Sequence, residues 1–101
     1  MLYLVYYIPV LNNTQKDPVF VYISDDLEKT KYLYKETCTN LSIYRKKLPE
    51  NKQDSYYIVK LIEIPENYQL TKIFSNYIKE SQHSNELEYQ IINKTWNIDF
   101  L

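Results

Sequence analysis

The sequence predicts an α+β domain: a mainly antiparallel sheet of three or four strands, a long helix on one face and a smaller C-terminal element. Three observations predict this fold. Two short apolar stretches lie close together near the N-terminus, a long amphipathic stretch follows them, and a third β-branched stretch comes next. With 101 residues and 45% hydrophobic content, the chain has the size and composition of one globular domain, residues 1–101.

The first two predicted strands form an antiparallel hairpin. Residues 2–8 are apolar on both alternating sets of side chains, which is typical of a strand in the middle of a sheet. We expect this strand to end near Pro9, because proline has no N–H for the ladder. Residues 12–18 are predicted as a polar loop in which asparagine replaces the missing glycine, and residues 19–23 form the second strand.

A helix is predicted over residues 26–44. It follows Ser24, Asp25 and Asp26, and the spacing of Asp25 and Glu28 is that of a capping box. One stripe of this helix is expected to pack on the sheet. The stripe consists of Leu27, Tyr34, Cys38 and Leu41, with Thr30 and Thr37 beside them.

The third strand is predicted over residues 56–64. A right-handed crossover returns it to the sheet, so that the first strand lies between the second and the third. Beyond it, residues 71–81 have helical spacing, and residues 87–91 and 96–100 alternate like two strands. The alternative for the last part is a helix over residues 85–95 with an extended tail.

The composition excludes several classes of chemistry. Without glycine, the chain has no phosphate-binding loop, dinucleotide fingerprint or nucleophile elbow. One cysteine and one histidine cannot form a Cys/His zinc site. Cys38 lies on the predicted buried stripe and His83 in a polar loop, so a catalytic Cys–His pair is not expected. We therefore expect no enzyme activity, no cofactor and no metal.

The apolar N-terminal stretch does not indicate membrane targeting. It has no positively charged start and is too short to span a bilayer, so a buried strand explains it better than a signal peptide does. We expect a soluble, intracellular, cytoplasmic protein without membrane contact.

The junction between the second strand and the helix carries a resemblance. It reads Val19-Phe20-Val21-Tyr22-Ile23-Ser24-Asp25-Asp26-Leu27-Glu28-Lys29-Thr30, a strand followed by a Ser-Asp cap and a helix. This pattern resembles that of many short phage and viral accessory proteins, although Thr30 stands where alanine is usual. The resemblance implies a ββαβ core and a viral setting, in which the cytoplasm would be that of the host cell, and it supplies no functional residue. The absence of glycine and alanine, with abundant Tyr, Ile, Asn and Lys, also indicates an AT-rich genome.

Aromatic residues supply the candidate partner-binding surface. The sequence has twelve tyrosines, and aromatic side chains are favoured anchors of protein interfaces. We expect a non-enzymatic protein-interaction module that binds another protein, with an aromatic face turned away from the helix. In the alternatives, the C-terminal third covers this face, or a homodimer forms through it or through the edge of the second strand. The candidate contacts are Tyr3, Tyr7, Phe20, Tyr22, Tyr56 and Trp96.

A nucleic-acid-associated protein is the second function considered. Arg45, Lys46 and Lys47 form the basic cluster, and they are the candidate phosphate contacts beside the aromatic face. The same residues close the predicted helix, where cations favour the helix dipole. The formal net charge of −1 disfavours nucleic acid, because phosphate contacts supply most of such affinity.

Overall fold

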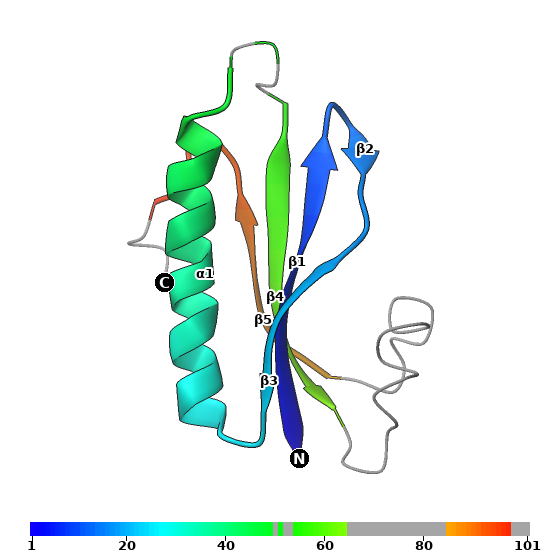
Figure 1. The fold of residues 1–101 in the computed structure, drawn as a ribbon, viewed down its shortest axis with the longest axis vertical. Helices are drawn as coiled ribbons and strands as arrows, with labels where there is room; N and C mark the ends of the chain where they lie inside the picture. The colour runs from blue at the N-terminus through cyan, green and yellow to red at the C-terminus, as the bar shows by residue number, and fades with distance from the viewer. Residues whose placement is uncertain (50, 52–53, 65–84, 98–101) are drawn as a thin grey trace.

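The computed structural model describes residues 1–49, 51, 54–64 and 85–97, and these residues form an α+β fold (Figure 1). The helix α1 (Leu27–Lys46) packs on one face of an antiparallel sheet. The strands are β1 (Leu2–Leu11), β2 (Thr14–Gln15), β3 (Val19–Ser24), β4 (Tyr56–Ile64) and β5 (Asn85–Ile92). The predicted fold class is therefore confirmed, with five strands in place of three or four.

Strand β1 lies in the middle of the sheet, as its two apolar faces predict. It pairs with β4 on one side and with β2 and β3 on the other, and β5 pairs with the far side of β4. Because β3 and β4 both run antiparallel to β1, they are parallel to each other. The chain must cross over between them, and α1 is that crossover.

The prediction that the first strand ends near Pro9 is wrong. Pro9 pairs with Tyr57 of β4, and its carbonyl oxygen accepts a hydrogen bond of 2.8 Å from the Lys16 amide. In a strand, the nitrogen and the carbonyl of one residue point to the same side. The missing N–H of Pro9 therefore faces the side of β2 and β3, and the ladder with β4 continues past it.

Two asparagines close the hairpin between β1 and β2. Asn12 and Asn13 have φ values of 51° and 65°, and they join Leu11 to its partner Thr14. A two-residue hairpin turn needs positive φ at both positions, which asparagine adopts more easily than most residues. The predicted role of asparagine in this glycine-free turn is confirmed.

The helix and its N-cap each lie one residue later than predicted. Asp26 is the N-cap, and its carboxylate accepts from the Lys29 amide at 3.1 Å. Ser24 supports the turn by accepting from the Asp26 amide at 3.0 Å. The predicted capping box of Asp25 and Glu28 is therefore replaced by a cap at Asp26.

Core residues lie on both faces of the sheet. Between the sheet and α1 they include Val5, Tyr34, Cys38, Val59, Leu61 and Ile92, which confirms the predicted helix stripe. On the other face they are Leu4, Tyr6, Ile8, Ile62 and Ile64.

The C-terminal region confirms one of the two alternatives. Residues 85–92 form strand β5, so the helix considered over residues 85–95 is wrong. Trp96 and Asn97 belong to no strand, which contradicts the start of the strand predicted over residues 96–100. The helix predicted over residues 71–81, the rest of that last strand and His83 lie outside the described residues.

Candidate protein-interaction site

The predicted aromatic contacts do not share one sheet face. Tyr3 and Tyr7 pack against the core on the helix side of the sheet. Phe20 packs on the opposite side, where its ring centre lies 6.2 Å from that of Tyr6. The proposed single face is therefore divided between the two sides of the sheet.

A β-bulge explains why Phe20 and Tyr22 separate. Tyr22 pairs with Val5 and Phe20 with Tyr6, so Val21 is an extra residue with no partner of its own. One extra residue reverses the alternation of side chains beyond it. Tyr22 thus lies on the side of α1, where the Lys29 ammonium is 5.8 Å from its ring centre.

The two remaining predicted contacts, Tyr56 and Trp96, also differ from expectation. Tyr56 is half-buried opposite Val10, while its neighbour Tyr57 points into the core under α1. Trp96 is buried on the helix side, and its indole Nε1 donates to the Gln90 side-chain oxygen at 3.0 Å. Trp96 is therefore not an exposed anchor, and it also does not cover the face turned away from the helix, as the alternative expected, because it packs on the helix side.

A groove lies between the end of α1 and the end of β1. Its volume is about 460 Å³, within the range of ligand pockets. We call it the tyrosine groove, because three of its eight lining residues are tyrosines. It is lined by Tyr7, Pro9, Leu11, Asn40, Leu41, Tyr44, Leu48 and Tyr57.

The three tyrosines form a packed cluster around Tyr57. The ring centres of Tyr7 and Tyr57 lie 5.8 Å apart at 87°, and those of Tyr44 and Tyr57 lie 6.4 Å apart at 62°. These edge-to-face contacts fix the rings and add to the stability that burial provides. Tyr57 is buried, Tyr7 is half-buried and Tyr44 is 59% exposed, so the cluster runs from the core to the surface.

The groove is uncharged at neutral pH. Burial raises the pKa of the Tyr57 hydroxyl, and the neighbouring Tyr44 and Tyr7 raise it further, while Arg45 lowers it. The Tyr57 hydroxyl therefore keeps its proton. The groove can offer apolar contacts and neutral hydrogen bonds.

The sequence reasoning found Tyr7 and missed Tyr44 and Leu48. The sequence predicts Tyr44 only as the last residue of the helix and assigns no role to Leu48. Asn40, Tyr44 and Leu48 are spaced by four residues, which places them along one side of a helix and its continuation. That spacing is the sequence signal that could have placed Tyr44 and Leu48 on one side of the helix.

The predicted phosphate contacts are divided as well. Arg45 is 2% exposed, and its Nε donates to the backbone carbonyl of Ser55. Lys46 and Lys47 are exposed at the helix end. The expectation that all three cations could face phosphate is wrong for Arg45, because its side chain connects α1 to the start of β4.

Cys38 is a buried core residue. Burial raises the pKa of its thiol to about 12, a contact with Tyr34 lowers it, and the charge of Glu88 raises it again. A thiol with such a pKa stays protonated and is a poor nucleophile at neutral pH. Across residues 1–49, 51, 54–64 and 85–97, no three His, Cys, Asp or Glu residues group as metal ligands.

We expect the Cys38 thiol to resist alkylation in the folded protein. At pH 8, iodoacetamide should label the native chain at least about tenfold more slowly than the urea-unfolded chain, because reaction requires opening of the core. Mass spectrometry measures the labelled fraction over time. Equal rates in the two states would contradict the buried position of Cys38.

Comparisons with protein families, with curated proteins and with solved structures give no match. Within the described ranges, no helix has the length and apolar character needed to cross a membrane.

Proposed function

We propose that the protein is a non-enzymatic interaction module that holds an apolar segment of a partner protein in the tyrosine groove. The observation that carries this proposal is the tyrosine cluster, with exposed Tyr44 at the surface and buried Tyr57 below it. Tyrosine combines a large apolar ring with a hydroxyl at low entropic cost, which makes it a frequent interface anchor.

The setting we propose is that of a small viral or phage accessory protein acting in the cytoplasm of its host cell. The strand, Ser-Asp cap and helix junction supports this setting by resemblance. The junction is present in the structure as β3, the Asp26 cap and α1. Such a protein would act by occupying a surface of a host or viral partner.

Replacing Tyr44 with alanine is expected to weaken partner capture by about tenfold or more, because a ring at the surface of the groove is lost. Tyr32→Ala is the matched control. Tyr32 lies on the same helix, is 67% exposed and does not line the groove. The tagged proteins are incubated with nuclease-treated host lysate, and mass spectrometry quantifies the captured partner.

Capture that depends on Tyr44 but not on Tyr32, with unchanged circular dichroism for both variants, supports the proposal. Equal capture by the wild type and Tyr44→Ala would contradict it. Loss of every partner on nuclease treatment, together with binding that falls steeply with salt, would instead favour the nucleic-acid function.

A further inference from the structure

The two edges of the sheet differ in how they are protected against pairing with another strand. The edge formed by β2 and β3 is interrupted at residues 16–18, where Lys16 and Pro18 lie. It is also distorted by the bulge at Val21. Charged residues, proline and bulges are the features by which edge strands usually avoid pairing with another chain.

The opposite edge, β5, lacks this protection over its second half. Among the described residues, β5 pairs only with β4. Glu86, Glu88 and a bulge at Leu87 disturb the first half of the strand. The second half, Tyr89 to Ile92, contains no charge and no proline. As far as residues 1–49, 51, 54–64 and 85–97 are concerned, it therefore presents backbone groups that pair with no other strand, and it has no feature that would prevent pairing.

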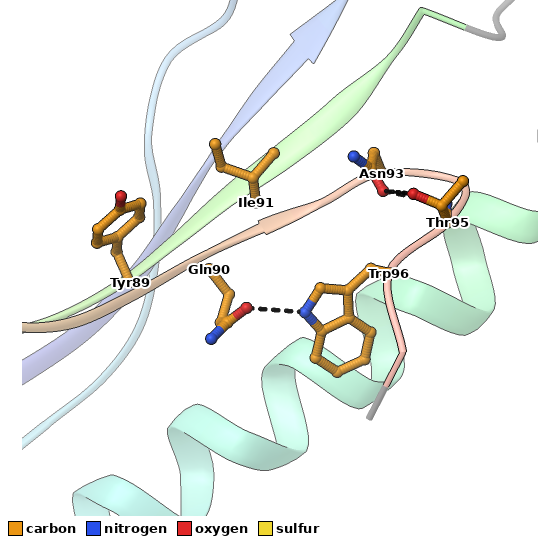
Figure 2. A pocket seen from close by; sticks show the side chains of 6 residues that line it. All are labelled: Tyr89, Gln90, Ile91, Asn93, Thr95 and Trp96. Carbon is orange, nitrogen blue, oxygen red and sulfur yellow. Dashed lines mark hydrogen bonds between the residues drawn. The ribbon is translucent and has the colours of Figure 1, made fainter. Parts of the chain in front are cut away.

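A hollow of about 430 Å³ accompanies this part of the edge. Figure 2 shows β5 in front of β4 and β1, with Tyr89 and Ile91 on one side of the strand and Gln90 and Trp96 on the side of α1. Three consecutive residues of β5 line the hollow, so it follows the strand itself. Its walls are Tyr89, Gln90, Ile91, Asn93, Thr95 and Trp96.

We propose that this edge binds a second copy of the chain, with the two β5 strands antiparallel about a two-fold axis at Gln90. The paired segment runs from Glu88 to Ile92, where the ladder with β4 is regular. A two-fold axis perpendicular to the sheet keeps each residue on its own face. Gln90 then lies opposite Gln90 of the second copy, and Tyr89 lies opposite Ile91.

The exposed apolar side chains fit this register. Tyr89 is 55% exposed and Ile91 is 46% exposed, and both lie on the face away from α1. In the dimer each Tyr89 contacts an Ile91 of the second copy. Aromatic and β-branched side chains directly opposite each other stabilise antiparallel strands. Because of the two-fold axis, the contact between Tyr89 and Ile91 occurs twice in the interface.

The charges on β5 also favour the axis at Gln90. In this register Glu88 lies opposite Ile92, and the two Glu88 carboxylates lie at opposite ends of the paired segment. An axis at Glu88 would place them directly opposite each other, and an axis at Tyr89 would make them diagonal neighbours, which like charges disfavour. Glu86 is already paired, since its carboxylate lies 3.0 Å from the Lys60 ammonium.

Symmetry limits the assembly to two chains. An interface between two copies of the same edge closes on itself, unlike a head-to-tail contact that continues into a fibre. The second edge of each sheet carries the protective features of β2 and β3, so it does not extend the sheet further.

The test is the oligomeric state of the full chain by light scattering and sedimentation velocity. We expect the wild type to dimerise with increasing concentration and Ile91→Lys to dissociate at least about tenfold more readily, because two lysines then occupy the interface. Val21→Lys is the matched control, since Val21 is an exposed β-branched residue on the other edge. A wild type that stays monomeric at about 1 mM, or an unchanged dimer in Ile91→Lys, would overturn the proposal.

Disulfide formation distinguishes this register from others. Under mild oxidation, an equal mixture of Tyr89→Cys and Ile91→Cys chains should form crosslinked dimers faster than either variant alone, because these positions face each other. Cys38 is buried and does not compete. Equal rates in all three samples would contradict the axis at Gln90, and a fast Tyr89→Cys reaction by itself would place the axis at Tyr89.

Discussion

Replacing Arg45 with alanine is expected to lower the free energy of unfolding by about 3 kcal/mol. The side chain is buried where the end of α1 meets the start of β4, and its Nε donates to the Ser55 carbonyl. The substitution would leave that buried carbonyl without its donor and a cavity where the guanidinium lay. Urea denaturation followed by circular dichroism measures the loss.

The adjacent Lys46 provides the control for this prediction. Lys46 is exposed in the same last turn of α1, so Lys46→Ala should change stability by less than about 0.5 kcal/mol. Arg45→Lys should fall between the two, because an ammonium keeps the charge but not the planar set of donors. If Arg45→Ala were no more destabilising than Lys46→Ala, the buried connection would be wrong.

This structural role affects how binding data are interpreted. A loss of partner capture in a variant lacking Arg45 would follow from its lower stability, so that loss would say nothing of phosphate recognition. The exposed Lys46 and Lys47 are the residues that test the nucleic-acid function. Their double replacement by alanine keeps the core intact and removes two of the three predicted phosphate contacts.

The elements of the fold follow closely from local sequence. The β4 strand and the β1–β3 pairing appear where β-branched and aromatic residues predict them, and Asp26 caps a helix whose stripe is visible in the sequence. Pro9 shows the limit of such rules. Proline interrupts the ladder only on the side that its missing N–H faces, and pairing on the other side can continue past it, as the pairing of β1 with β4 does.

The candidate site was less predictable, because it depends on which face of the sheet each side chain occupies. Alternation along a strand assigns faces correctly only between bulges, and the bulge at Val21 moves Tyr22 and Phe20 to opposite sides. No sequence signal marks that extra residue. The tyrosine groove also needs Tyr7, Tyr44 and Tyr57 to meet, although they come from three different elements.

Replacing Tyr34 with phenylalanine is expected to stabilise the protein by about 1 kcal/mol or more at pH 7. Within the described part of the chain, the buried Tyr34 hydroxyl has no hydrogen-bond partner. The nearby Cys38 thiol does not replace one, because a thiol is only a weak donor and a weak acceptor. An unsatisfied buried polar group costs about 1–3 kcal/mol, and phenylalanine removes it while keeping the ring. Urea denaturation of the variant and the wild type measures the difference.

The stability that Tyr34→Phe gains should increase at alkaline pH, because Tyr34 is one of three buried acids with raised pKa values in the described part of the chain. Burial is the main cause for Tyr34, Cys38 and Tyr57 alike. Each keeps its proton in the folded chain after it has ionised in the unfolded chain, so the unfolded state binds fewer protons and stability falls as pH rises. The loss begins near the ordinary pKa of Cys38, 9.0, and that of tyrosine, 10.0.

Between about pH 10 and pH 12, Tyr34 and Cys38 should each lower the free energy of unfolding by about 1.4 kcal/mol per pH unit, because both keep their protons in the folded chain over this range. Tyr34→Phe removes one group and should reduce the slope accordingly. Tyr32→Phe is the matched control for removal of a tyrosine hydroxyl, because Tyr32 lies exposed on the same helix. Parallel stability curves for the wild type and Tyr34→Phe between pH 7 and about pH 12 would show that the Tyr34 hydroxyl ionises as readily in the folded chain as in the unfolded one.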